Sequence, residues 1–410
     1  MRADLDTLMA ERKLDAILVG GGEQYNDVRD YLSYGARITG GLIVKRRDHA
    51  PLLTVSGMEL DEARKSGLEC TTYAEMGFYD LLQETDDRLL VEARLWGRAL
   101  ARAGLERGRV GLYGTDAIHV ILALYQRLCA ELPQYDFVGD DHKISLFQAA
   151  FLTKDAEEMA RVRSVAQRTD EVLRATWDFI AKHRAADDER VVDDQGQALT
   201  VGQVKSFVRA ALLARGLEDT GMIFAQGRDA GFPHSRGQDD QALKVGQAIV
   251  FDLFPRELGG GYHHDMTRTW CINFAPPAVQ QAYDQVMQAF NRALEAYALG
   301  KPTHLLQEVV LDTFEAQGHP TLRSDPKTMC GYVHSLGHGL GLNVHERPSI
   351  THLRKDDVFQ VGNLITIEPG LYYPEDGYGV RVEDTFFIDE SGALLSLTPF
   401  PKDLILPLKG

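Results

Sequence analysis

The chain has 410 residues, enough for two hydrophobic cores, and its 44% hydrophobic and 25% charged residues are typical of a soluble globular protein. The formal net charge of −16 opposes binding to phosphate backbones, and no basic patch stands out, so we expect no nucleic-acid partner. No apolar stretch approaches the roughly 18 residues of a membrane span, and residues 1–18 lack the apolar core of a signal peptide. We therefore expect a cytoplasmic protein with no membrane partner.

Short apolar runs alternate with helical patterns in the first 150 residues, which predicts an α/β domain. The runs cover residues 16–19, 40–44, 51–55 and 110–113. Leu89 to Ala103 predicts a helix with Leu89, Trp96 and Leu100 on one side. Gly20 to Gly22 lacks the Gly-x-Gly-x-x-Gly spacing of a dinucleotide-binding loop, and we interpret it as a turn.

A domain boundary is predicted near residue 150, which divides the chain into residues 1–150 and residues 151–410. Thr153 is a good helix N-cap, and the acidic residues at 155, 157 and 158 suit the positive end of the helix that follows. Met159, Val162, Val165 and Val172 form the apolar stripe of that helix.

Further helices are predicted in the second domain. Thr200 and Gln203 have the spacing of a capping box, and this helix ends near Gly216. Another helix is predicted from Pro277 to Gly300, and the last over residues 303–317. Residues 185–197 are charged and turn-rich, which predicts a surface loop. The remaining segments from Ala248 to Leu406 have the pattern of strands and turns.

The cysteines have no spacing typical of a zinc or redox motif. In a reducing compartment we expect free, mostly buried thiols. The residues concerned are Cys70, Cys129, Cys271 and Cys330.

Carboxylates set into apolar or β-branched runs recur in the second domain. They are Asp252, Asp265, Glu368 and Glu383. A buried, unpaired carboxylate is costly, so it gains a proton or finds a cation. Any one of them alone is more often a capping or salt-bridged residue. Because side chains alternate along a strand, Arg381 and Glu383 project together, away from Val380 and Val382. Acids that converge on one space repel each other, so we expect a positive group among them.

Three histidines lie among glycines in residues 334–348. They are His334, His338 and His345. The spacing of His334 and His338 resembles half of a zincin helix, but Ser335 stands where that motif has its general-base Glu, and the neighbouring glycines oppose a regular helix. A lone histidine here would more often be structural. Three of them, near strand-mounted acids, favour a metal site.

The order and spacing of these blocks resemble the pita-bread metallopeptidases, in the branch of aminopeptidase P and prolidase. The matching blocks are Asp252, Asp265-x-Thr-Arg-Thr269, Gly337 to Leu342 with Val344 to Glu346, Thr366 to Gly370, and Gly379 to Asp384. The match covers roughly residues 150–400. The resemblance implies an α/β N-terminal domain of the creatinase/prolidase type, followed by an α+β pita-bread catalytic domain.

The resemblance also implies the metal ligands. Asp265 and Glu383 would bridge two divalent ions, Asp252 would bind one of them, and His338 and Glu368 the other. Four carboxylates and a hydroxide nearly balance two divalent cations. Oxygen-rich ligation with one imidazole suits manganese, with cobalt or zinc as alternatives.

The implied reaction is attack of a metal-bridging hydroxide on the bond between an N-terminal residue and a following proline. Glu368 would take the proton of the water and pass it to the leaving nitrogen. His234 matches the family histidine that steadies the tetrahedral intermediate or the leaving amine, and His345 matches a second histidine facing the substrate. His334 and Arg381 match supporting residues around the metals and the substrate.

Other polar residues near these blocks match no family ligand. We interpret His263 and His264 as part of a solvated turn, and Glu346 and Asp384 as structural or supporting residues. The chain also departs from the common Asp-x-Gly pattern after Asp252, and its second aspartate comes two residues late. We expect a wider hairpin with Gly259–Gly261 at its tip, which leaves the metals unaffected and the shape of the substrate pocket open.

Several related activities compete. Methionine aminopeptidases share the ligands but usually lack the large N-terminal domain and a block like Arg381 to Asp384. Inactive pita-bread binding modules and creatinase-type enzymes lack the full metal set. The closest alternative is a Xaa-Pro dipeptidase, whose site often grips the free carboxylate of the dipeptide. No such clamp is visible, so we favour a Xaa-Pro aminopeptidase. Because the family commonly forms dimers, we also expect a homodimer.

Overall fold

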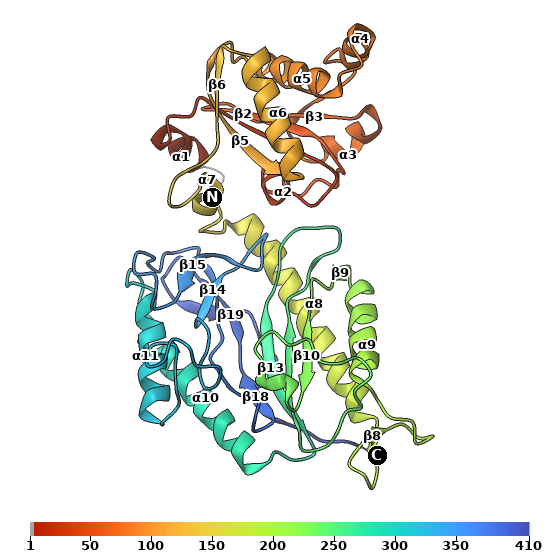
Figure 1. The fold of residues 1–410 in the computed structure, drawn as a ribbon, viewed down its shortest axis with the longest axis vertical. Helices are drawn as coiled ribbons and strands as arrows, with labels where there is room; N and C mark the ends of the chain where they lie inside the picture. The colour runs from red at the N-terminus through yellow and green to blue at the C-terminus, as the bar shows by residue number, and fades with distance from the viewer. Residues whose placement is uncertain (1–3, 410) are drawn as a thin grey trace. The chain divides into compact units, whose positions relative to one another are not determined.

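The computed structural model describes residues 4–409 (Figure 1). Residues 1–3, which begin the segment analysed above for a signal peptide, and residue 410 lie outside the described residues. The chain divides into two compact units, one formed by Met1–Phe151 with Gly259–Gly261 and the other by Leu152–Leu258 with Tyr262–Gly410. No helix in the described part of the chain is both long and apolar enough to span a membrane.

A mixed sheet forms the centre of the N-terminal unit, in the strand order β4-β3-β2-β1-β5-β6. Its strands are β1 (Ala16–Gly21), β2 (Leu42–Arg46), β3 (Leu52–Val55), β4 (Glu69–Thr72), β5 (Gly108–Thr115) and β6 (Tyr135–Val138). β1, β5 and β6 are parallel, whereas β2 is antiparallel to β1 and β3. The sequence pattern misses β4 and β6 because each is four residues long and contains an acidic residue.

Helices of the N-terminal unit precede and follow these strands. They are α1 (Leu5–Glu11), α2 (Asp27–Leu32), α3 (Leu60–Arg64), α4 (Phe78–Glu84), α5 (Arg88–Arg102), α6 (Ile118–Glu131) and α7 (Leu146–Ala150), with a 3-10 turn at Gly57–Glu59. The predicted helix at Leu89 to Ala103 is α5, which begins where Asp87 accepts a hydrogen bond from the Leu90 N–H (3.1 Å). α5 and α6 pack beside each other and share a hydrophobic core with the sheet.

The glycine run at Gly20 to Gly22 is not the predicted turn. Gly20 and Gly21 instead complete β1, where they pair in parallel with Gly114 and Thr115 of β5. The prediction is wrong because the ladder with β5, a partner about ninety residues away in the sequence, holds this backbone extended.

Long helices of the second unit are close to their predicted bounds. They are α8 (Ala156–Ala181), α9 (Val201–Leu213), α10 (Pro277–Ala296) and α11 (His304–Ala316), with a 3-10 turn at Asp229–Gly231. The capping box of Thr200 and Gln203 is confirmed. α8, however, is capped by Asp155 and not by Thr153, because the Asp155 carboxylate accepts hydrogen bonds from the first turn and the Glu158 side chain accepts one in return.

The strands of the second unit form small sheets. β10-β11-β13-β21 and β15-β14-β16-β19-β20 are the larger ones, and the pairs are β12-β9, β17-β18 and β7-β8. Their bounds are β7 (Arg184–Ala185), β8 (Val191–Val192), β9 (Leu217–Glu218), β10 (Ile223–Gln226), β11 (Ala248–Leu253), β12 (Arg256–Glu257), β13 (Met266–Ile272), β14 (Gly337–Gly339), β15 (Glu346–Ile350), β16 (Leu364–Ile367), β17 (Gly370–Tyr373), β18 (Tyr378–Arg381), β19 (Asp384–Ile388), β20 (Leu394–Ser396) and β21 (Ile405–Leu406).

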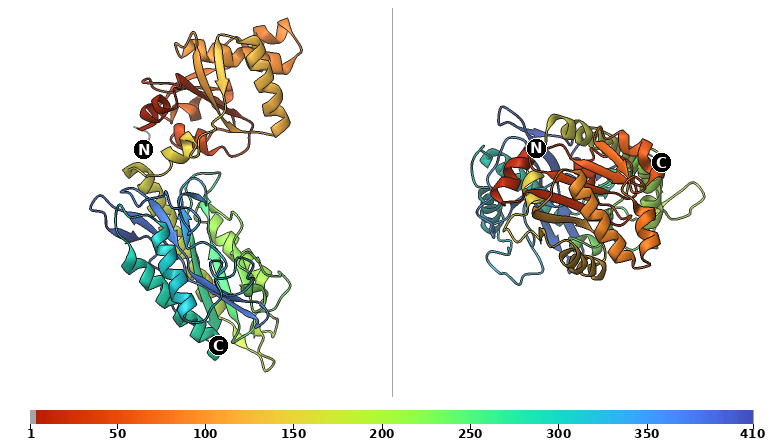
Figure 2. Two further views of the ribbon diagram at one scale, coloured as in Figure 1. Left: turned by 60° about the vertical axis from the view of Figure 1, so that its left-hand side comes forward. Right: turned by 90° about the horizontal axis from the view of Figure 1, so that it is seen from above.

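Two hydrophobic clusters attach the helices to these sheets. One joins α8 and α9 to β10, β11 and β13, and the other joins α10 and α11 to strands from β16 to β19. Figures 1 and 2 show the two helix pairs on opposite flanks of the strands. The strands between the helix pairs carry the predicted metal ligands at or near their ends.

Two smaller predictions need correction. The segment 185–197 is not simply a surface loop, because Val191 and Val192 are buried in a short hairpin with β7. All four cysteines are free, but only Cys271 is buried, since Cys129 is exposed and the other two are half-buried.

Candidate metal centre

The predicted metal ligands come from different strands of the second unit. Asp252 lies in β11, Asp265 directly precedes β13, His338 lies in β14, Glu368 follows β16, and Glu383 lies between β18 and β19. All five line one cavity of about 630 Å³, together with His234, His334, His345 and Arg381. The structure therefore brings every sequence-predicted site residue to the same cavity.

Strand register explains how the acids meet. β11 and β13 are antiparallel with Asp252 opposite Thr267. Thr267 also pairs with Glu383, whose N–H donates to the Thr267 carbonyl (3.1 Å). Thr267 is thus a common neighbour that holds two acids, distant in the sequence, on adjacent strands.

Distances within the cluster are those of side chains able to share an ion. His338 Nε2 lies 3.5 Å from Glu368 Oε1 and 3.8 Å from Asp265 Oδ2. Asp265, His338 and Glu383 each offer a ligand atom within 4.8 Å of the others. Two atoms bound tetrahedrally to one ion at about 2.1 Å are about 3.4 Å apart, so small shifts would complete coordination.

Buried carboxylate oxygens in the cluster have no hydrogen-bond partner among the described residues. They are Asp252 Oδ1, Asp265 Oδ1 and Glu383 Oε1. An orphaned, buried carboxylate oxygen is strongly unfavourable unless a cation satisfies it. The donor set of four carboxylates and one imidazole therefore fits divalent metal ions.

The pKa values of the acids in the cluster also indicate a site for positive ions. Burial, reinforced by the nearby Glu383 and Asp252 charges, raises the pKa of Asp265 well above its ordinary value. Burial and Glu383 likewise raise the pKa of Glu368, and burial and Asp252 raise the pKa of Glu383 to about 8. Acids that disfavour each other's ionisation to this degree need positive charge between them to stay ionised at neutral pH.

His338 is held in the form that binds metal. Its Nδ1 lies 3.0 Å from the Gly339 carbonyl, so this nitrogen donates and Nε2 faces the acids as an acceptor. Burial, with a smaller contribution from His345, lowers the pKa of His338 to about 3, which keeps the imidazole neutral. A Cβ at Gly337 would stand 2.1 Å from the Thr366 carbonyl oxygen, so the strand carrying His338 approaches β16 as only glycine permits.

Arg381 is the cation nearest to the acids. Its Nη2 donates to Asp252 Oδ2 (2.6 Å), its Nε to Thr267 Oγ1 (3.1 Å), and its Nη1 to the Tyr372 hydroxyl (2.9 Å) and the Pro233 carbonyl (3.2 Å). These bonds engage all three guanidinium nitrogens and use four of the five N–H groups. Arg381 therefore orients Asp252, and one N–H group at most is left for a substrate carboxylate.

Two supporting residues were not foreseen in the sequence. The Thr267 hydroxyl donates to Glu383 Oε2 (2.7 Å), and the Tyr372 hydroxyl joins Arg381 to His334 Nε2 (2.9 Å). Thr267 lies inside the Asp265–Thr269 block, so that block held a signal for it. Tyr372 lies outside every matched block, and only its position in β17 brings it to the site.

Comparison with known proteins identifies the family. The sequence model of metallopeptidase family M24 matches residues 160–390, more than half of the chain. The chain belongs to metallopeptidase family M24.

One curated relative matches most of the chain and another matches less than half of it. The putative dipeptidase YkvY of Bacillus subtilis is 28% identical over 368 residues, 88% of this chain and 87% of that protein. A Xaa-Pro dipeptidase of Pyrococcus furiosus is 34% identical over 171 residues, 42% of this chain and 45% of that protein.

Solved structures share the fold over the whole length. The X-Pro aminopeptidase from Thermotoga maritima has a TM-score of 0.74 at 22% identity, with 97% of this chain and 99% of that chain covered. The prolidase from Pyrococcus horikoshii has a TM-score of 0.74 at 22% identity, with coverage of 98% and 99%. The predicted pita-bread fold and family are confirmed. Because M24 is a family of metallopeptidases, membership agrees with the fit of the acid cluster to metal ions.

His263 and His264 were predicted to lie in a turn exposed to solvent, and this prediction is wrong. Both are buried, at 3% and 0% exposure, and burial lowers their pKa values to about 4 and about 3. The His263 N–H donates to the Gly341 carbonyl (2.8 Å), while His264 Nε2 lies 3.4 Å from Thr398 Oγ1. Two consecutive polar residues suggest exposure to solvent. Here segments far along the chain bury them.

The longer segment between Asp252 and Asp265 forms the expected wide turn. Arg256 and His263 pair across it, and Gly259–Gly261 lie between them. Glu346 and Asp384 have structural partners, since Lys154 Nζ lies 2.7 Å from Glu346 Oε2 and Arg268 Nη2 lies 2.9 Å from Asp384 Oδ1.

Proposed function

We propose that the chain is a dinuclear metal-dependent Xaa-Pro aminopeptidase, which hydrolyses the bond between an N-terminal residue and a following proline. The observation that carries the proposal is the group of buried acids with orphaned oxygens around His338, in a cavity of about 630 Å³. The family match supports a metallopeptidase, and relatives and solved structures with Xaa-Pro dipeptidase and X-Pro aminopeptidase names support the substrate class.

The proposed ligand set follows from position and charge. Asp265 and Glu383 would hold both of two divalent ions, Asp252 would bind one of them, and His338 and Glu368 would bind the other. The short distances from His338 to Asp265 and Glu368 support their sharing one ion. Oxygen-rich ligation favours manganese over cobalt or zinc.

Divalent ions in this site, when bound, lower the pKa of an attacking water and polarise the substrate carbonyl. Within the cavity, Glu368 is the proposed proton carrier, because its carboxylate is the most exposed of the four, at 15% for the side chain. It takes the proton from the water and delivers it to the leaving nitrogen of proline.

His234 and His345 are the proposed substrate-facing residues. His345 packs edge-to-face on His338, with ring centroids 4.4 Å apart, and His234 follows Pro233, whose carbonyl is bound by Arg381. Both line the cavity beside the acids. They are placed to donate to the carbonyl oxygen as it gains negative charge.

Charge within the cavity favours a peptide longer than two residues. A dipeptide carries a free carboxylate next to its proline, and a dipeptidase gains from a cation that grips it. Arg381 is the cationic side chain among the lining residues other than the histidines, and its guanidinium is already committed to Asp252 and Tyr372. The dipeptidase remains the second candidate, because curated relatives carry dipeptidase names.

Hydrolysis of Ala-Pro-Ala, Ala-Pro and Ala-Ala-Ala by manganese-loaded protein, together with metal analysis, tests the proposal. We expect two ions per chain, cleavage of Ala-Pro-Ala in preference to Ala-Pro, and little cleavage of Ala-Ala-Ala. Preference for Ala-Pro would replace the aminopeptidase by the dipeptidase. Absence of bound metal and of all cleavage would refute the metallopeptidase site itself.

We also propose a homodimer, on the family resemblance. Sedimentation at micromolar concentration should show a species of about twice the 45.7 kDa chain mass. A single species of monomer mass would contradict it.

A further inference from the structure

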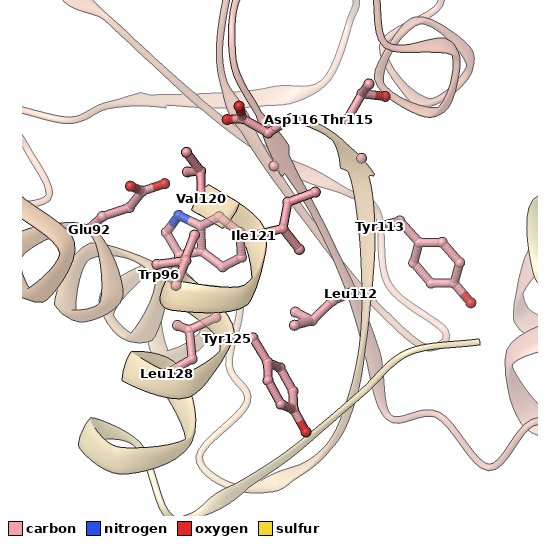
Figure 3. Close-up of a pocket in the computed structure, with 14 residues that line it drawn as sticks. Glu92, Trp96, Leu112, Tyr113, Thr115, Asp116, Val120, Ile121, Tyr125 and Leu128 are labelled. Carbon is pink, nitrogen blue, oxygen red and sulfur yellow. The ribbon is translucent and has the colours of Figure 1, made fainter. Parts of the chain in front are cut away.

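A cavity of about 120 Å³ lies in the N-terminal unit, separate in sequence from every residue of the metal centre. It opens between α5 and α6, at the carboxyl ends of β1 and β5 (Figure 3). Its lining includes Gly20 and Gly21 from β1, and Gly114 and Thr115 from β5. The glycine run that fits neither a turn nor a dinucleotide loop therefore forms part of this cavity.

The position in the sheet is one at which α/β proteins bind ligands. β1 and β5 are parallel neighbours, so their carboxyl ends lie at the same edge. The chain leaves β1 for β2 on one side of the pair and leaves β5 for β6 on the other. Such a divergence of connections leaves a crevice outside the strand ends, which is the usual ligand site of open α/β sheets.

The floor of the cavity is built so that only glycine fits. A Cβ at Gly20 would lie 2.5 Å from Cζ2 of the Trp96 indole, and a Cβ at Gly114 would lie 1.8 Å from the Gly20 carbonyl oxygen. The missing side chains let the indole lie directly on the strand end. The shape of the cavity floor therefore depends on glycine at these positions of β1 and β5.

Apolar and aromatic side chains make the walls. They are Trp96, Leu112, Val120, Ile121, Leu124, Tyr125 and Leu128. Figure 3 shows the Trp96 indole among these side chains, with α6 beside it. Ile121 and Tyr125 are 44% and 40% exposed, so the cavity is open at its α6 edge. A cavity of roughly 150 Å³ with comparable walls holds a benzene molecule, so this one suits a single ring or a branched alkyl group.

The charged side chains that line the cavity are all acidic. Glu92 and Asp116 both line it, and none of its lining residues is basic. Glu92, one helical turn before Trp96, is half-buried and forms no hydrogen bond or ion pair within residues 4–409. Burial, with the charge of Asp116, raises the pKa of Glu92. A half-buried carboxylate without a partner, in a cavity that also contains an indole, is complementary to an organic cation.

We propose that this cavity binds a small apolar amine, with the ammonium group at Glu92 and the apolar body between Trp96 and α6. Glu92 supplies a charge-assisted hydrogen bond, the Trp96 ring supplies cation–π attraction, and Trp96 and Tyr125 supply apolar contact. Asp116, exposed at the rim, adds long-range attraction for the positive charge and disfavours anions.

Calorimetric titration of the full chain with benzylamine tests the proposal, with uncharged benzyl alcohol as the matched compound. We expect a dissociation constant on the order of 1 mM for benzylamine and roughly tenfold weaker binding of benzyl alcohol. Glu92→Gln should weaken benzylamine roughly tenfold and leave benzyl alcohol unchanged. Glu106→Gln, an equal change of charge at an exposed position outside the cavity, should alter neither.

A second variant tests the location. Val120→Phe fills the cavity from α6 and should abolish binding of both compounds, while circular dichroism and Ala-Pro-Ala cleavage remain those of the wild type. Benzylamine binding unaffected by Glu92→Gln would mean that the amine binds elsewhere, including at the metal centre. Equal affinity for the alcohol would mean that Glu92 does not select a cation. Either result overturns the proposal.

Discussion

Replacing Thr267 by valine is the sharpest test of how the acids are held. The side chain is fully buried, and valine preserves its shape. The hydroxyl donates to Glu383 Oε2 at 2.7 Å and accepts from Arg381 Nε at 3.1 Å. The substitution therefore removes one hydrogen bond from a buried carboxylate and one from a buried guanidinium without opening a cavity.

The magnitude follows from those two bonds. Loss of a hydrogen bond that orients a metal ligand typically weakens metal binding 10- to 100-fold, or about 1.4–2.7 kcal/mol. Each bond to a charged group is worth about 1.5–3 kcal/mol, but Arg381 keeps its bonds to Asp252 and Tyr372, so the Glu383 bond dominates. We expect manganese affinity to fall roughly 30-fold.

Competition with a chelator of known affinity measures this change, and thermal unfolding monitors the fold. Thr176→Val is the matched control, because Thr176 is equally buried but its hydroxyl bonds only to the Val172 carbonyl within α8 (2.8 Å). The control should keep wild-type manganese affinity. Wild-type affinity in folded Thr267→Val, or an equal loss in Thr176→Val, would refute the reasoning.

Three further outcomes are expected. Glu368→Ala should abolish turnover of Ala-Pro-Ala, since it removes a proposed ligand and the proposed proton carrier; a variant that keeps about a tenth of the wild-type rate contradicts that role. Manganese at 100 times its dissociation constant should stabilise the metal-free protein by about 2.7 kcal/mol and raise the unfolding midpoint by roughly 3–5 °C, reversibly with chelator, and an unchanged midpoint would argue against a built metal site. Gly114→Ala should destabilise the chain by about 2 kcal/mol or more in denaturant unfolding, because its φ is 121° and the added Cβ meets a backbone oxygen. Gly139→Ala, with open space around the added carbon, should stay within about 0.5 kcal/mol of wild type, and similar values for the two would count against the clash.

Helices with strong local signals were predictable from the sequence. The capping box at Thr200 and the apolar spacing of α5 involve residues within one or two helical turns, so no distant partner decides them. The cap of α8 shows the limit of this reasoning. Thr153 and Asp155 are both good caps, and only the reciprocal bonds with Glu158 select Asp155.

Burial and strand pairing were predictable to a lesser extent. His263 and His264 are polar neighbours in a turn-rich segment, yet contacts with Gly341 and Thr398 enclose them. Gly20 and Gly21 have the composition of a turn, yet β5 holds them in a strand. In both places the deciding partner is distant in the chain, and a local pattern contains no information about it.

The candidate metal centre was likewise predictable only in part. The sequence alone predicted which residues belong together. Carboxylates set into apolar strands are unfavourable unless a cation is near, and the order of these residues and His338 resembles one family. The tertiary structure decided which oxygens stay unpaired, that Thr267 lies between Asp252 and Glu383, and that Arg381 is occupied by Asp252 and Tyr372. The contacts of Thr267 with Glu383 and of Arg381 with Asp252 join segments more than a hundred residues apart in the chain, and their register is set by packing of the whole unit.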